Sequence, residues 1–321
     1  MKRLEAVPAF FLVLWVAFQG AAFAQSYPSR PIRIMVGFTA GGGTDIAARK
    51  LAERLQPLLG QAMIVENRPG AGGAIALQVT ARADPDGYTL GVGSSTATAF
   101  KIFNKDVTLD LQRDLAPVGK YALGIGMLVV NTKLPVKTVP EFIAYAKANP
   151  GKVAYGSPGG TVWLALEAFK QQAGIDMLHV QYKGAADYAT ALLADQVQLI
   201  LDNPSTQQGN VDAGKVRFIA AVVKKRLATY PNIPTVGETL PGWDYIIWNA
   251  LFVPAKTPKA VIDRLTRDMK TVATSDEYKA DTLKWSNGGY EADWGTPEDL
   301  EQDIARDTKR WADLARAAKV E

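Results

Sequence analysis

The 321-residue chain contains no cysteine and a single histidine. Without cysteine there can be no disulfide, no thiolate nucleophile and no thiolate metal site. His179 follows apolar residues in a short segment, a setting more typical of a packed or hydrogen-bonded structural histidine than of a catalytic base. Clusters of histidine, or of carboxylates at the spacing of a metal-binding loop, are also missing, so we expect no metal and no cofactor.

Long basic runs are missing as well. The formal net charge is +4, and no basic run is longer than the three residues 224–226. Lysine and arginine elsewhere alternate with acidic residues, as on the solvated faces of helices. This pattern argues against a nucleic-acid partner, whereas a small positive excess is compatible with a small anionic ligand.

No apolar run is long enough to span a bilayer, which requires about 20 residues. The run at residues 9–18 follows a short basic start and precedes the small-residue pattern Ala-Phe-Ala at 22–24. These features predict a signal peptide over residues 1–24, cleaved before Gln25, and an exported mature chain. An uncleaved anchor helix is the alternative that this pattern favours less.

Glycine, in contrast, is concentrated at the junctions between expected strands and helices. The sequence Phe-Thr-Ala-Gly-Gly-Gly-Thr-Asp at 38–45 separates a short apolar strand at 32–36 from a helical apolar stripe over 47–59. A glycine run at that junction exposes backbone N–H groups at a helix N-terminus, where the helix dipole favours an anion. The alternative is a turn that needs glycine only for tight packing.

Strand–turn–helix units repeat along the chain. Further strands are expected at residues 62–66, 88–92, 127–131, 153–156, 179–182, 197–201 and 216–222. Such repetition predicts an α/β fold with parallel sheets covered by helices. Ligands of such sheets bind beyond the carboxyl ends of the strands. Loops of small residues fall in two sets there, near 39–45 and 94–98 and near 157–161 and 202–206, which two lobes facing each other across a cleft would explain.

An ordered set of motifs runs through this framework. They are Tyr-Pro-Ser-Arg-Pro-Ile at 27–32, Ala-Gly-Gly-Gly-Thr-Asp at 40–45, Val-Glu-Asn-Arg-Pro-Gly-Ala-Gly-Gly at 65–73, Pro-Asp-Gly-Tyr-Thr-Leu at 85–90, Tyr-Lys-Gly at 182–184, Ala-Gly-Lys at 213–215, Arg226, Pro-Asn-Ile-Pro-Thr at 231–235, Trp248 and Pro-Ala-Lys-Thr-Pro at 254–258. With this set, over essentially the whole mature chain, the sequence resembles the extracytoplasmic solute receptors of tripartite tricarboxylate transporters, often called Bug receptors.

The resemblance implies a two-lobed periplasmic binding protein of the type II, Venus-flytrap class, each lobe a mostly parallel sheet with flanking helices. It implies that the protein captures a small carboxylate, a di- or tricarboxylate, in the periplasm. The carboxylate would then be delivered to the membrane subunits of a transporter. We expect a monomer with no nucleic-acid partner.

Two apolar stretches flank the second set of strands and helices, at residues 123–127 and 248–252. They are expected to cross between the lobes as paired hinge strands. Lobe 1 would then contain residues 25–122 plus 251–321, and lobe 2 residues 123–250.

The glycine loop is expected to anchor a carboxylate through charge-assisted hydrogen bonds from its amides, with hydroxyl groups completing the site. Asp45 is expected to cap the helix or fix the loop geometry, because its charge would repel an anion. The candidate ligand-binding residues are Phe38, Thr39, Ala40, Gly41, Gly42, Gly43, Asp45, Ser94, Ser95, Ser157, Thr161, Trp163 and Asp202.

The sequence departs from the family pattern in the third loop. Trp163 stands where a histidine is usual, while Gln181 and Gly37 stand where a proline is common. An indole at position 163 could line the cleft and favour a flat or aromatic acid, or it could only pack on its own helix.

Two functions from different classes remain. A binding protein with no catalytic residues is favoured. The alternative is an exported α/β enzyme acting on a small organic acid, which would need an acid and a base. Ser94, Ser95 and Ser157 would all compete for one histidine as their base.

Overall fold

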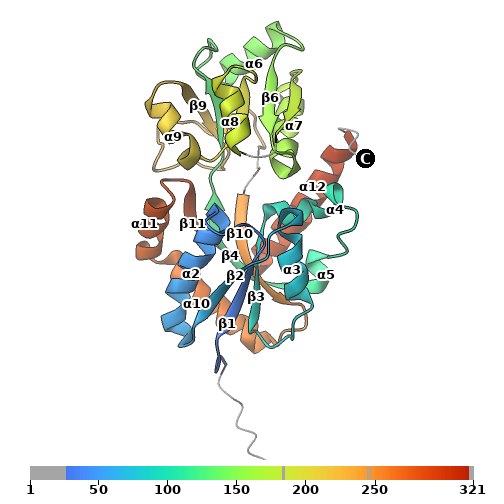
Figure 1. Cartoon of the computed structure of the whole chain (residues 1–321), viewed down its shortest axis with the longest axis vertical. Helices are drawn as coiled ribbons and strands as arrows, with labels where there is room; N and C mark the ends of the chain where they lie inside the picture. The colour runs from blue at the N-terminus through green and yellow to red at the C-terminus, as the bar shows by residue number, and fades with distance from the viewer. Residues whose placement is uncertain (1–26, 183–184, 244, 246, 318–321) are drawn as a thin grey trace, which may run out of the picture.

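The computed structural model describes residues 27–182, 185–243, 245 and 247–317, so the expected signal peptide lies outside the described residues. The chain forms two α/β lobes stacked along the long axis of the molecule, and each lobe is built on one β-sheet (Figure 1). No helix of the described part combines the length and the apolar character that crossing a bilayer requires.

The larger sheet has six strands in the order β11-β4-β10-β3-β1-β2. These strands are β1 (Ile32–Val36), β2 (Met63–Asn67), β3 (Thr89–Ser94), β4 (Leu115–Gly124), β10 (Ile247–Pro254) and β11 (Tyr290–Gly295). Strand β1 pairs in parallel with β2 and β3, whereas β10 and β11 pair antiparallel with their neighbours. The helices of this part of the chain are α2 (Gly43–Leu59), α3 (Ala74–Ala81), α4 (Phe100–Phe103), α5 (Leu111–Asp114), α10 (Lys259–Thr274), α11 (Asp276–Trp285) and α12 (Pro297–Ala317), with the 3-10 turns η1 (Ala71–Gly73) and η2 (Ser95–Ala99).

The smaller sheet has five strands in the order β7-β6-β8-β5-β9. These are β5 (Met127–Asn131), β6 (Ala154–Ser157), β7 (Leu178–Gln181), β8 (Leu199–Asp202) and β9 (Val216–Ala221). Strand β6 pairs in parallel with β7 and β8, and β5 runs antiparallel between β8 and β9. The helices of this part are α6 (Val139–Ala148), α7 (Gly160–Ala173), α8 (Ala185–Leu193) and α9 (Pro204–Asp212), with the 3-10 turn η3 (Val236–Glu238).

Both sheets are therefore mixed. Their parallel pairs come from the strand–turn–helix units that the sequence predicts, because a crossover helix returns the chain to the same end of the sheet. The first of these units shows why the local sequence folds this way. The apolar stripe of α2 is buried against the sheet, and the helix ends at Gly60, whose φ of 68° is a left-handed conformation that glycine adopts without strain.

The chain crosses between the lobes beside paired strands. Strands β4 and β10 pair antiparallel, with Leu123 opposite Trp248 and Gly124 opposite Ile247. Two residues after β4, the chain enters β5 of the smaller sheet. The lobe boundaries expected at residues 122/123 and 250/251 fall inside β4 and β10, and both strands lie in the six-stranded sheet.

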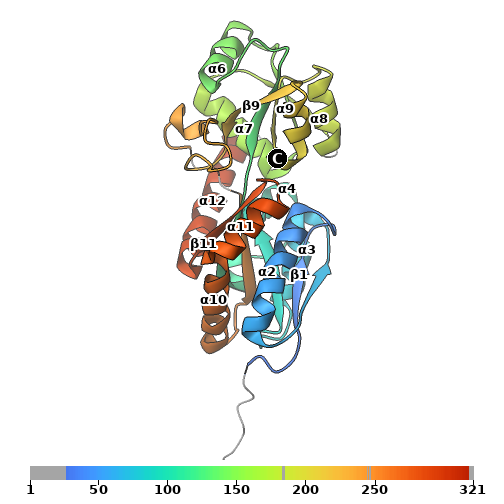
Figure 2. The same ribbon diagram turned by 90° about the vertical axis from the view of Figure 1, so that its left-hand side faces the viewer.

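Helix α12 also connects the lobes. It rises from the lobe of the larger sheet towards the lobe of the smaller one (Figures 1 and 2). Near its end, Trp311 is buried in the hydrophobic core of the smaller lobe, where its ring meets Tyr245 edge-to-face with the centroids 5.4 Å apart. At the base of the crossing, Trp248 Nε1 donates to Asp307 Oδ2 over 3.2 Å.

Candidate functional site

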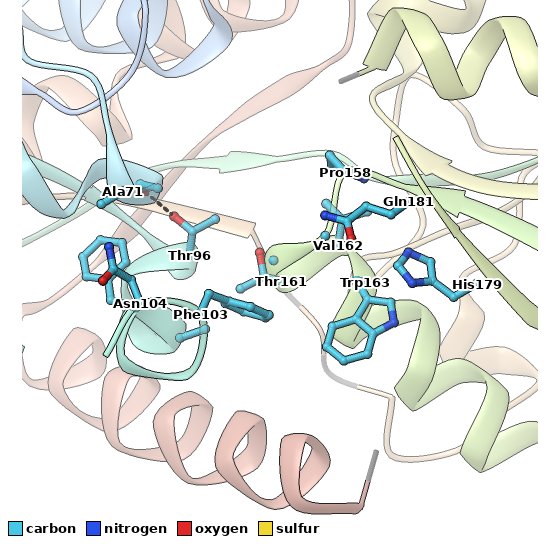
Figure 3. Close-up of a pocket in the computed structure, with 15 residues that line it drawn as sticks. Ala71, Thr96, Phe103, Asn104, Pro158, Thr161, Val162, Trp163, His179 and Gln181 are labelled. Carbon is cyan, nitrogen blue, oxygen red and sulfur yellow. Dashed lines mark hydrogen bonds between the residues drawn. The ribbon is translucent and has the colours of Figure 1, made fainter. Parts of the chain in front are cut away.

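A cavity of about 700 Å³ lies between the two lobes, a size that suits a small organic molecule (Figure 3). The larger lobe contributes residues of η1, η2 and α4, and the smaller lobe contributes the loop after β6, the start of α7 and the end of β7. The lining residues are Ala71, Gly72, Thr96, Ala99, Phe100, Phe103, Asn104, Pro158, Gly159, Gly160, Thr161, Val162, Trp163, His179 and Gln181. None of these side chains carries a formal charge at neutral pH when His179 is neutral.

An aromatic stack forms the wall of the cavity in the smaller lobe. The His179 ring stacks on Tyr155 and on Trp163, with centroid distances of 5.0 and 5.7 Å. Its Nε2 lies 2.8 Å from Ser157 Oγ. Burial lowers the pKa of His179, Lys170 lowers it further, and Glu167 opposes them without reversing the shift. The lowered pKa favours the neutral imidazole, which forms part of the cavity wall.

The opposite wall contributes an aromatic ring that meets this stack. Phe103 of α4 lies edge-to-face with Trp163 at a centroid distance of 6.2 Å, and the Phe103 side chain is 42% exposed. Figure 3 shows the two rings approaching each other from the two lobes. Trp163 thus lines the cavity as well as packing on its own helix, and one side of the cavity is apolar and flat.

The first glycine loop is held from within by Asp45. Its carboxylate accepts hydrogen bonds from Gly41 N (2.9 Å), Asn67 Nδ2 (2.8 Å) and Arg49 Nε (3.0 Å). Burial raises the pKa of Asp45, but the bonds from Arg49, Gly41 and Asn67 outweigh it and leave the pKa below its ordinary value. Asp45 therefore fixes the loop, as its charge suggested, and its oxygens are directed to protein donors.

Two amides of this loop are already engaged. Gly41 N donates to Asp45, and Gly42 N donates to Thr39 O over 3.2 Å. The amides of Thr39, Ala40 and Gly43 make no hydrogen bond within the described part of the chain and remain available at the N-terminus of α2.

The steric requirement for glycine in this loop falls on Gly43. A Cβ atom there would approach the Tyr290 ring to 2.7 Å, so the ring lies directly against the start of α2. At Gly42, by contrast, a Cβ atom would meet only Thr39 among the protein atoms, at 3.2 Å from its carbonyl oxygen.

The predicted hydroxyl groups have different surroundings. Ser94 Oγ lies 2.6 Å from Thr96 Oγ1, which donates to Gly72 O, the bond drawn in Figure 3. Ser157 Oγ lies against His179 and accepts from Gly159 N. Thr161 lines the cavity, whereas Ser95 Oγ is buried without a partner in the described residues.

Asp202 is a structural carboxylate in this arrangement. It accepts hydrogen bonds from the side chains of Tyr188 (3.0 Å), Thr206 (2.8 Å) and Gln207 (2.6 Å), and from the amide that follows it (2.8 Å). These hydrogen bonds hold the start of α9, and they leave the oxygens of the Asp202 carboxylate with little capacity to accept a hydrogen bond from a ligand.

Of the candidate residues, the structure brings Thr161 and Trp163 to the cavity wall. Phe100 and Phe103 form part of the wall that faces them and were not among the predicted site residues, because nothing in the local sequence distinguishes them from packed apolar side chains. His179 was assigned a structural role, and its place in the wall follows from the pairing of β6 with β7. Within the described residues, no group of three or more histidine, cysteine or acidic residues could hold a metal ion.

Comparison with known sequences identifies relatives over most of the chain. Residues 47–320 match the family model described as tripartite tricarboxylate transporter family receptor. The chain is 35% identical over 280 residues to the UPF0065 protein in the gbd 5′ region of Cupriavidus necator, covering 85% of this chain and 84% of the relative. It is 32% identical over 321 residues to BugT of Bordetella pertussis, covering 98% and 97% of the two chains.

Solved structures of related proteins share the fold of this chain. An R. palustris protein solved with adipate has a TM-score of 0.76 and 30% identity, covering 92% of this chain and 99% of its own. MatC from Rhodopseudomonas palustris with bound malate has a TM-score of 0.71 and 25% identity, covering 90% and 99%. The periplasmic binding protein BugD has a TM-score of 0.73 and 30% identity, covering 92% and 99%.

Proposed function

Because the chain belongs to the tripartite tricarboxylate transporter receptor family, we propose that it is a periplasmic solute-binding receptor. It captures a small carboxylate between its lobes and passes it unchanged to the membrane subunits of a transporter. The observation that carries this proposal is the cavity shared by both lobes and lined by neutral side chains. The relatives solved with adipate and malate support the carboxylate.

The ligand is held at two kinds of surface. Its carboxylate lies near the N-terminus of α2, where the free amides of Thr39, Ala40 and Gly43 and the helix dipole favour negative charge. Its carbon skeleton lies against the rings of Trp163 and Phe103. This combination favours an acid with an apolar or flat body over a compact, highly charged one.

Ligand binding favours the closed form, because a molecule that touches both lobes gains contacts that an open form cannot provide. In this proposal lobe 1 comprises residues 25–122 plus 251–321 and lobe 2 residues 123–250. The mature protein acts as a monomer, released into the periplasm after removal of residues 1–24.

Isothermal titration of the mature protein with adipate, malate and benzoate tests the proposal, after any co-purified ligand has been removed by unfolding and refolding. We expect saturable binding of at least one acid, and mass spectrometry should recover that acid unchanged. Conversion of the acid would support the enzyme alternative instead. Absence of binding to all three acids would contradict the proposed ligand class.

A further inference from the structure

A buried carboxamide without a hydrogen-bond partner lies beside the crossing between the lobes. Asn249 sits in β10, opposite Ser94 of β3 and Ala122 of β4, and only 1% of it is exposed. Neither its Oδ1 nor its Nδ2 makes a hydrogen bond within the described residues. Leaving both atoms of a buried amide unpaired is unfavourable, so such a group in a folded protein requires an explanation.

Tyr290 connects Asn249 to the first glycine loop. The Tyr290 ring lies against Gly43, where a Cβ atom would come within 2.7 Å of it. Tyr290 pairs with Gly124 of β4 and Asn249 pairs with Ala122, two residues away on the same strand, so the two side chains project from the same face of the sheet. Asn249 therefore lies on the same face of the sheet as the aromatic ring that contacts the start of α2.

A second unpaired group comes from the adjacent strand end. Ser95 follows Ser94, the residue opposite Asn249, and its Oγ is buried without a partner in the described residues. The other buried polar atoms without partners in the described part each belong to a different side chain, and most of these are aromatic. Asn249 is the side chain in that set that leaves two polar atoms unpaired.

We propose that Asn249 determines carboxylate binding from the inner end of the cleft, with Ser95 and Tyr290 completing a neutral polar subsite. When the ligand is bound, Asn249 Nδ2 donates to a carboxylate oxygen of the ligand, and Oδ1 accepts from the Tyr290 hydroxyl. The anion is thus recognised by neutral donors and by the N-terminus of α2, with no arginine or lysine side chain required. This inference rests on the proposed function and adds a residue that contacts the ligand.

Two substitutions at one position separate this role from a structural one. Asn249→Asp keeps the shape but replaces the donor with a negative charge, so binding of the carboxylate should weaken by about 100-fold or more. Asn249→Leu removes both polar atoms and should weaken binding about 10- to 100-fold. Its ligand-free Tm should stay equal or rise, because an unpaired buried amide is removed.

The measurements are isothermal titration with adipate, malate and benzoate, and thermal unfolding of the ligand-free proteins. Thr257→Val is the matched control, because Thr257 is also buried with an unpaired hydroxyl but lies beyond the far end of β10. It should leave the affinity unchanged.

Wild-type affinity in Asn249→Asp would overturn this inference and leave the proposed function standing. A ligand-free Tm lower by more than about 3 °C in Asn249→Leu, with unchanged affinity, would show a purely structural role and also overturn it. A wild-type protein that binds none of the three acids would overturn the proposed function itself.

Discussion

Replacement of Trp163 by histidine tests whether the aromatic wall selects the ligand. The indole lines the cavity, stacks on His179 and meets Phe103 from the other lobe. Histidine keeps a planar ring at the start of α7 but removes the larger part of the apolar face. The fold should therefore be retained while the contact with the body of the ligand is reduced.

The magnitude follows from the area that a ligand loses. If about 50 Å² of apolar contact disappears, at about 25 cal/mol per Å², the loss is about 1.2 kcal/mol. That loss weakens binding about eightfold for an acid whose body rests on the indole. Malate, which is small and polar, should lose much less than benzoate, so the ranking of the acids should change.

Isothermal titration of the wild-type protein and Trp163→His with benzoate, adipate and malate measures this ranking. Phe103→Ala should act in the same direction, because Phe103 lines the same cavity. Leu178→Ala is the control, since Leu178 is 54% exposed and is not among the cavity-lining residues. An unchanged ranking in Trp163→His would show that the indole only packs, and the preference for a flat or apolar acid would then be abandoned.

Three further results are expected. Because the pKa of Asp45 is depressed in the folded state, its contribution to stability is present above the unfolded pKa of about 3.9 and is lost as the pH falls through the lower folded value. Asp45→Asn should accordingly lower Tm at pH 7 and approach the wild type at pH 3, and an equal Tm deficit at both pH values would contradict this. Gly43→Ala should displace Tyr290 and so weaken carboxylate binding, measured by titration, at least about tenfold, more than Gly42→Ala does. Gly209→Ala is the control, because Gly209 lies in open space on α9. Thermal unfolding should show that Gly209→Ala raises stability by about 0.5–1 kcal/mol. Saturating ligand should decrease the radius of gyration in small-angle scattering and raise Tm, and an unchanged radius would argue against closure.

The local part of the fold was predictable from the sequence. The apolar run of β1, the stripe of α2 and the glycine that ends the helix are local patterns, and the structure confirms them. The insertion of antiparallel β10 between β3 and β4 joins segments more than 120 residues apart, and no periodicity in the sequence reports such pairing. The mixture of parallel and antiparallel pairs in both sheets therefore could not be predicted from the sequence.

The same distinction applies to the site. Glycine at a strand–helix junction indicated the loop, and the chemistry of an anion indicated why Asp45 turns inward. The unpaired side-chain amide of Asn249 was not predictable, because its surroundings depend on the pairing of β3, β4, β10 and β11, which are far apart in the sequence. Phe103 was missed because an exposed ring on a single-turn helix acquires meaning only when Trp163 approaches it from the other lobe.

The anchoring of Trp311 in the smaller lobe gives α12 a mechanical role. Because Leu300 and Ile304 pack in the larger lobe and Trp311 is buried in the smaller one, we expect α12 to resist separation of the lobes. The free energy of opening would then depend partly on Trp311, a residue far along the chain from those that line the cavity. A fluorescent probe at Lys309, whose side chain is 80% exposed and which is not among the cavity-lining residues, is expected to report a change in the position of α12.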